Sequence, residues 1–92
     1  MAELEQTSSI TVAIVDDDPL VRRLLRAWLE ELGHGIVEIA SGREALGRID
    51  DEVDAVCLDL GLEDVPGLDV MRHLRANGVE APFLVVTAER AI

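Results

Sequence analysis

Hydrophobic and polar positions alternate along this chain in two distinct patterns. Short, continuous apolar runs bounded by polar residues predict strands that are buried on both faces. These runs occupy residues 10–15, 36–39, 55–58 and 83–86. Between them, apolar residues recur at helical spacing, which predicts helices over about 19–32, from 41 to about 49, and over about 68–76. Strands that alternate with helices form a parallel sheet with right-handed crossovers, so we expect an α/β domain.

Polar residues at the predicted helix starts support these boundaries. Asp18 precedes Pro19, which is the combination of an N-cap and a proline at the first helical position. Ser41 and Glu44 have the spacing of a capping box, in which each residue satisfies a backbone N–H near the helix start. The first and second helices are therefore expected to begin directly after Asp18 and Ser41.

The first predicted helix carries one apolar face and an unusual distribution of charge. Five residues have the spacing of a single buried face, namely Val21, Leu24, Leu25, Trp28 and Leu32. Its charged residues oppose the helix dipole, with Arg22, Arg23 and Arg26 toward the start and Glu30 and Glu31 at the end. Two interpretations remain open: the arginines have a use near the acidic edge, or they form a solvated face.

Composition limits the size and class of the protein. The chain has 92 residues, of which 49% are hydrophobic, so we expect one domain with a real core rather than a disordered chain. Residues 1–9 are polar and predicted to be a flexible tail, and residues 10–92 the folded domain. The lone cysteine, Cys57, excludes an intrachain disulfide and is interpreted as a small core residue.

Charge and hydropathy also restrict the partners and the location. The net charge of −11 argues against nucleic acid or an anionic membrane as a direct partner of this segment. The first residues lack the basic start and apolar centre of a secretory signal, and no apolar run approaches membrane-spanning length. A cytoplasmic location is therefore expected.

Acidic residues follow two of the predicted strands at the point where each strand ends. Asp16 and Asp17 follow the first strand, Asp59 follows the third, and Thr87 follows the fourth. Because the carboxyl ends of parallel strands share one edge, where α/β sheets bind ligands, these side chains are expected to converge. Crowded carboxylates repel one another, and a Mg²⁺ ion relieves that repulsion. We assign Asp18 to the helix cap and the other aspartates to the site.

The alternative interpretation of these acids is structural. Residues 16–18 would then be a solvated cap and Asp59 a turn residue. The site is favoured because the acids directly follow apolar strands. Asp59 is also a candidate nucleophile, since an aspartate can accept a phosphoryl group as an acyl phosphate, and Thr87 could hydrogen-bond a phosphoryl oxygen.

Four short motifs together resemble the receiver domain of bacterial two-component response regulators. They are VDDDP at 15–19, LDLGL at 58–62, PGLD at 66–69 and VTA at 86–88. The resemblance extends from residue 10 to the end of the sequence. It implies a flavodoxin-like parallel sheet with the strand order 2-1-3-4-5.

The resemblance also implies a function and a set of site residues. Asp59 would accept a phosphoryl group from the phosphohistidine of a sensor histidine kinase, and Thr87 would be the switch hydroxyl. Mg²⁺ would be bound by Asp16, Asp17 and Asp59 together with the backbone carbonyl of Gly61. Such a domain is a phosphoacceptor rather than an enzyme, and it regulates an output domain outside this chain.

The sequence departs from the family pattern in one respect. In the family, a fifth strand ends in a lysine that pairs with the phosphoryl group, whereas this sequence contains no lysine and ends at Ile92. We therefore expect a truncated receiver domain of strand order 2-1-3-4, with the fifth strand and last helices missing. The exposed edge of the fourth strand, residues 83–86, is then expected to mediate homodimerisation.

Three alternative functions compete with phosphotransfer. A pseudo-receiver, which acts as an interaction or dimerisation module without phosphorylation, agrees with the missing lysine. An aspartyl-phosphate phosphatase usually has a second aspartate two residues after the nucleophile, where this chain has Gly61. Flavin binding lacks the Ser/Thr-rich phosphate loop after the first strand. The receiver and the pseudo-receiver are the two hypotheses retained.

Overall fold

Four parallel strands and three helices make up the part of the chain that the structure, a computed structural model, describes, residues 9–86. In chain order they are β1 (Thr11–Val15), α1 (Pro19–Glu31), β2 (Gly35–Ile39), α2 (Gly42–Arg48), β3 (Ala55–Leu58), α3 (Gly67–Ala76) and β4 (Phe83–Val85). The sheet order is β2-β1-β3-β4, and every pair of neighbouring strands is parallel. The predicted α/β class and the order 2-1-3-4 are therefore confirmed.

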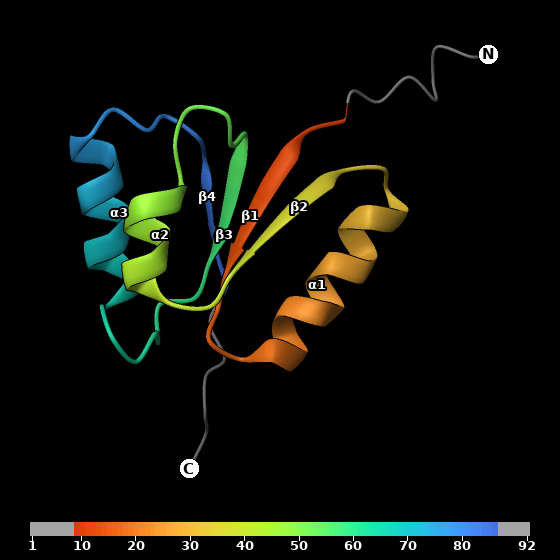
Figure 1. The fold of residues 1–92 in the computed structure, drawn as a ribbon, viewed down its shortest axis with the longest axis horizontal. Coiled ribbons are helices and arrows are strands. Elements are labelled where there is room, and N and C mark those ends of the chain that lie inside the picture. The colour runs from red at the N-terminus through yellow and green to blue at the C-terminus, as the bar shows by residue number, and fades with distance from the viewer. Residues whose placement is uncertain (1–8, 87–92) are drawn as a thin grey trace.

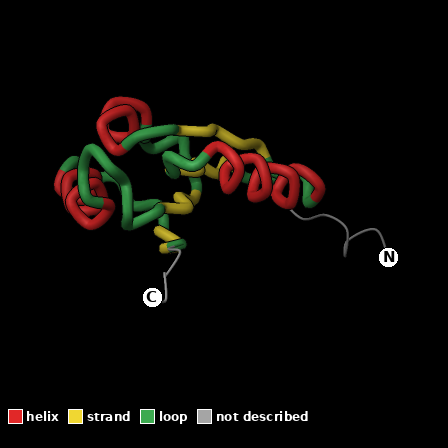
Figure 2. The backbone as a smooth tube through the Cα atoms, turned by 90° about the horizontal axis from the view of Figure 1, so that it is seen from below, coloured by secondary structure: helices red, strands yellow, loops and turns green. Residues whose placement is uncertain are grey.

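The helices lie on both faces of this sheet. Helix α1 covers one face, and α2 and α3 lie side by side on the other (Figures 1 and 2). The larger cluster of buried side chains lies between the sheet and the pair α2–α3, and it includes Val15, Ile39, Val56, Leu58, Val70 and Leu74. The smaller cluster lies under α1 and consists of Val12, Ile14 and Cys57. The prediction that Cys57 is a core residue is confirmed, since it is 8% exposed.

The predicted buried face of α1 is partly wrong. Leu24, Trp28 and Leu32 are 55%, 61% and 67% exposed. The α1 residues that pack against the smaller core cluster are Leu25 and Leu29. Helix α1 thus contacts the sheet along a different line from the one that apolar spacing suggested.

Ion pairs to β2 accompany this orientation. Arg22 and Arg26 project from one flank of α1 and both pair with Glu38 of β2. The arginine flank of the helix therefore lies beside β2, next to the apolar contact made by Leu25 and Leu29. The apolar residues on the opposite flank consequently remain at the surface, because a narrow line of contact cannot bury an apolar arc that extends around the helix.

The predicted caps are present at the helix starts. A carboxylate oxygen of Asp18 accepts the N–H of Leu20 at 2.9 Å, and the Ser41 hydroxyl accepts the N–H of Glu44 at 3.1 Å. The Glu44 carboxylate reaches back to the N–H of Ala40 at 3.2 Å rather than to that of Ser41. Both helices therefore begin where the capping residues predicted.

Two predictions concern residues that lie outside the described part of the chain. The predicted tail, residues 1–9, falls outside the described residues except for Ser9, and so does Thr87. Within residues 9–86, none of the helices has the length and hydropathy needed to cross a membrane.

Candidate functional site

The carboxyl edge of the sheet brings β1 and β3 to an end side by side. Their last residues, Val15 and Leu58, are register partners. The backbone bonding continues for one more residue on each strand: the N–H of Asp59 donates to the carbonyl of Val15 at 3.0 Å, and that of Asp16 donates to Ile39 at 3.1 Å. The sheet itself therefore fixes the backbone from which Asp16 and Asp59 project.

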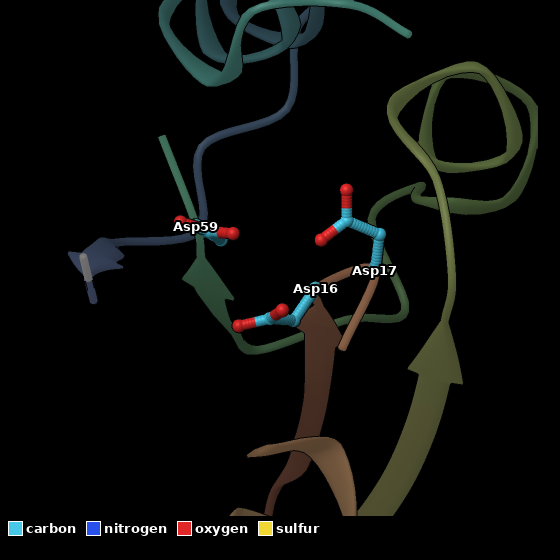
Figure 3. A group of neighbouring side chains, drawn as sticks. All are labelled: Asp16, Asp17 and Asp59. Carbon is cyan, nitrogen blue, oxygen red and sulfur yellow. The ribbon is translucent and has the colours of Figure 1, made fainter. Parts of the chain in front are cut away.

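Three carboxylates converge at this edge. One oxygen from each of Asp16, Asp17 and Asp59 lies within 4.8 Å of the others. Figure 3 shows Asp16 and Asp17 projecting from the end of β1 and Asp59 from the end of β3, toward a shared space. Asp16 is buried, with 6% exposure, whereas Asp17 and Asp59 are partly exposed. The cluster is thus buried at Asp16 and reached by solvent at Asp17 and Asp59.

Backbone N–H groups orient each carboxylate. The donors to Asp16, Asp17 and Asp59 are Asp18, Glu63 and Gly61, at 2.9, 3.1 and 3.0 Å respectively. Each bond engages a single oxygen. Among residues 9–86, the second oxygen of each carboxylate accepts no further hydrogen bond from the protein and is available for a ligand.

The electrostatic cost of the cluster is concentrated on Asp16. Burial raises the pKa of this carboxyl above its ordinary value of 3.8, and the neighbouring charges of Asp59, Asp17 and Asp18 raise it further. The backbone hydrogen bond from Asp18 acts in the opposite direction and favours the ionised form. A bound cation would offset both the burial and the repulsion.

The donor set suits a hard divalent cation. Carboxylate oxygens, completed by water molecules and a phosphate group, are ligands that Mg²⁺ accepts. The three aspartates could therefore hold such an ion. Gly61 borders the cluster through its N–H bond to Asp59.

Thr87 lies outside the described residues, so the structure does not place its hydroxyl. The residue before it, Val86, donates its N–H to the carbonyl of Leu58 at 2.9 Å. The end of β4 therefore lies beside the residue that precedes Asp59.

One residue beside the cluster was not identified from the sequence as part of the site. The Arg22 side chain is 16% exposed, and its Nη1 donates to the backbone carbonyl of Asp16 at 2.6 Å. Its neighbour Arg23 is exposed. Arg22 therefore contacts the acidic edge, whereas Arg23 lies on a solvated face. The sequence signal was the placement of positive charge against the helix dipole.

A second contact that the sequence did not reveal involves Asp64, in the loop between β3 and α3. Its carboxylate accepts the N–H groups of Gly42 and Arg43, at 2.9 and 2.8 Å, at the start of α2. These bonds lower the pKa of Asp64 below its ordinary value of 3.8. Because Glu63 in the same loop donates to Asp17, the loop links the acidic cluster to α2.

The fold and the acidic edge define a class of protein: a flavodoxin-like α/β domain with a carboxylate cluster where β1 and β3 end. The family model described as the response regulator receiver domain matches residues 12–92. The chain belongs to this family, and the resemblance noted in its motifs is confirmed.

Curated relatives include two mycobacterial regulators. Response regulator MprA of Mycolicibacterium vanbaalenii is 40% identical over 84 residues, which cover 90% of this chain and 36% of that protein. Transcriptional regulatory protein TcrA of Mycobacterium tuberculosis is 35% identical over 88 residues, or 95% of this chain and 35% of that protein. The chain thus spans about a third of the length of these relatives.

Solved structures of similar fold include two receiver proteins. The response regulator TrrA of Thermotoga maritima, determined in complex with Mg(2+)-BeF, superimposes with a TM-score of 0.79 and 31% identity, covering 87% of this chain and 70% of that one. A CheY-like receiver domain from Methylobacillus flagellatus gives a TM-score of 0.81 and 32% identity, covering 89% and 72%. These similarities support the assignment of fold and family.

Proposed function

We propose that Asp59 is the phosphoacceptor of this receiver domain and that the reaction requires Mg²⁺ bound by Asp16, Asp17, Asp59 and the backbone carbonyl of Gly61. The observation that carries the proposal is the convergence of three carboxylates within 4.8 Å at the carboxyl edge of the sheet. The complex of TrrA with Mg(2+)-BeF supports the same chemistry, since TrrA is 31% identical to this chain.

The geometry suggests a role for each oxygen of Asp59. Its Oδ1 accepts the N–H of Gly61 at 3.0 Å, which leaves Oδ2 free to attack phosphorus. In the transfer, a bond forms between Oδ2 and phosphorus, the phosphorus–nitrogen bond of the phosphohistidine breaks, and its electron pair returns to the imidazole. Mg²⁺ held by these residues would supply positive charge that offsets the charge of the carboxylates and of the transferred phosphoryl group. Asp16 and Asp17 provide the remaining carboxylate ligands.

The remaining parts of the proposal are those that the resemblance to the family implies, and family membership supports them. The phosphoryl donor is a sensor histidine kinase, and Thr87 is the hydroxyl that responds to the phosphoryl group. The phosphorylated domain regulates an output domain outside this chain, in the cytoplasm, and acts as a phosphoacceptor rather than as an enzyme on other substrates. This segment makes no direct contact with nucleic acid or membrane, which agrees with its net charge of −11.

Phosphorylation by a small donor tests the proposal. Incubation with radiolabelled acetyl phosphate and Mg²⁺ should give a label that survives acid and is lost in base or hydroxylamine, as expected for an acyl phosphate. Asp59→Asn should abolish the label, because an amide oxygen is a far weaker nucleophile. The exposed Asp69→Asn should label like the wild type.

The site assignment depends on where the label goes. Equal labelling of wild type and Asp59→Asn would contradict the role of Asp59. Labelling unaffected by chelation of Mg²⁺ would contradict the metal requirement. The yield is expected to be lower than for receivers that carry a phosphoryl-pairing lysine, since this sequence contains none.

A second candidate function is association without phosphorylation, and exposed apolar residues on β4 favour it. Leu84 and Val85 are 63% and 42% exposed. Within residues 9–86, β4 is the terminal strand of the sheet and is bonded to β3. We propose that two copies associate through this edge, which would extend the sheet across a two-fold axis.

A further inference from the structure

Arg22 occupies an unusual place for a helix-surface arginine. Its side chain is only 16% exposed, and its guanidinium joins three elements: α1, which carries it, the end of β1, and β2. We propose that Arg22 is a positioning residue for the Asp16 carboxylate and that Glu38 holds Arg22 in place. This inference rests on the proposed metal site, in which Asp16 is a ligand.

The peptide group of Asp16 is the point on which Arg22 acts. Asp16 follows the last residue of β1, and its N–H still bonds to the carbonyl of Ile39. Among the described residues, the donor found for its carbonyl is Arg22 Nη1, at 2.6 Å. Because Asp16 is buried, this carbonyl would lose much of its hydrogen bonding without that guanidinium. Arg22 thus donates a hydrogen bond to Asp16 at the point where the hydrogen bonds of the sheet end.

Glu38 determines where the guanidinium lies. Its Oε1 accepts from Arg22 Nε at 3.1 Å, and its Oε2 accepts from Arg26 Nη1 at 2.8 Å. Glu38 precedes Ile39, whose carbonyl binds the N–H of Asp16. The end of β2 therefore restrains Asp16 twice, directly through Ile39 and indirectly through Glu38 and Arg22.

These restraints bear on the carboxylate because the chain turns at Asp16. The carboxylate Oδ1 accepts the N–H of Asp18, so its direction depends on the path of residues 16–18. With the carbonyl of Asp16 fixed by Arg22, that path is fixed as well. Groups that orient metal ligands in this way commonly change metal affinity by about 10- to 100-fold when removed.

Positioning and simple electrostatics predict opposite results for the loss of Arg22. A positive charge beside a cation site repels the ion, so its removal should tighten metal binding if charge were its only effect. If Arg22 orients Asp16, its removal should weaken binding instead. The conservative Arg22→Lys keeps the charge but cannot donate to both Glu38 and Asp16 from a planar fork.

Binding of Mn²⁺, measured by water-proton relaxation on the full 92-residue chain, separates the two effects. We expect Arg22→Gln and Arg22→Lys each to weaken Mn²⁺ binding roughly tenfold. Arg23→Gln is the matched control: it removes the same charge from the adjacent, exposed position and should bind as the wild type does or slightly more tightly. Glu38→Gln, which leaves Arg22 present but poorly held, should weaken binding by a smaller factor.

A metal-free signal tests the hydrogen bond itself. The carbonyl ¹³C shift of Asp16 and the amide ¹⁵N shift of Asp17 report on the bond that Asp16 accepts. Both should move in Arg22→Gln and stay unchanged in Arg23→Gln. This measurement needs a folded variant but no metal. A general loss of stability would therefore not be mistaken for loss of this hydrogen bond.

The outcomes distinguish the inference from the proposed function. Mn²⁺ binding that is equal or tighter in Arg22→Gln, with unchanged shifts at Asp16 and Asp17, would overturn the positioning role alone. Failure of the wild type to bind Mn²⁺ would overturn the metal site and, with it, the role assigned to Arg22.

Discussion

At the scale of single residues, the carboxyl of Asp16 shows how a cluster of carboxylates lowers the stability of the folded protein. It is 6% exposed and lies among the charges of Asp17, Asp18 and Asp59. Both conditions disfavour the ionised form, and burial is the larger cause of its raised pKa. The folded chain therefore holds a proton on Asp16 more strongly than the unfolded chain does.

Asp16→Asn should stabilise the metal-free protein at neutral pH by on the order of 1 kcal/mol, since the amide carries no charge. The Asn oxygen can still accept the N–H of Asp18. Because the folded-state pKa of Asp16 is raised, the wild type loses stability relative to the variant as pH rises from below 3.8 through that raised pKa. Thermal melts at acidic pH, below 3.8, and at neutral pH should show the difference only at neutral pH.

Added Mg²⁺ should reverse this order. The ion stabilises the folded state that binds it, so the wild type should gain melting temperature while Asp16→Asn gains little. An equal gain in both proteins would show that Asp16 is not a ligand.

At the scale of elements, the start of α3 is held extremely close to the end of β3. A Cβ atom added at Gly67 would lie 2.5 Å from the carbonyl oxygen of Asp59 and 2.7 Å from the Cα of Leu60. Both obstacles are backbone atoms, which cannot move aside as a flexible side chain can. The glycine therefore allows α3 to begin directly against the segment that carries the phosphoacceptor candidate.

Gly67→Ala should lower stability by about 3 kcal/mol, because it forces backbone segments apart. The displaced segment includes Asp59, so Mg²⁺ binding should weaken as well. Gly47→Ala is the matched control: its Cβ would meet nothing within 4 Å, and alanine in a helix should raise stability by roughly 0.5 kcal/mol. Urea melts with and without Mg²⁺ measure both effects, and equal stability of the two variants would contradict this account of Gly67.

At the scale of the whole molecule, apolar surface gathers on the face of the sheet that carries α1. Leu84 is the register partner of Cys57, which lies under α1, so Leu84 faces the same side. Its exposed fraction is 63%, and Trp28 on α1 is 61% exposed. This exposure, together with the edge of β4, is the physical basis for the proposed association of two copies.

Sedimentation velocity over a wide concentration range should show reversible dimers of the wild type, and Leu84→Glu should shift the population toward monomer. Leu68→Glu adds the same charge at an exposed apolar position of α3 and should associate like the wild type. Higher salt should favour the dimer, because a net charge of −11 on each copy opposes association. A monomeric wild type at all concentrations would refute the proposal.

Local patterns in the sequence were sufficient to predict the elements and the position of the candidate site. Predicted boundaries of strands and helices agree with the observed ones within about one residue, since hydrophobic period and capping chemistry act over only a few positions. Convergence of Asp16, Asp17 and Asp59 could also be expected, because parallel neighbouring strands end at a common edge. The alternation of predicted strands and helices along the sequence had already indicated that the strands are parallel.

Contacts between distant segments were decided only by the tertiary structure. The flank of α1 that meets β2 pairs with Glu38, which lies 16 residues from Arg22, and the apolar arc of the helix is wider than its contact with the sheet. Capping of α2 by Asp64 likewise joins positions 21 and 22 residues apart. The sequence around Glu38 or Asp64 does not indicate its distant hydrogen-bond partner, because such bonds depend on how the loops and helices pack on the sheet.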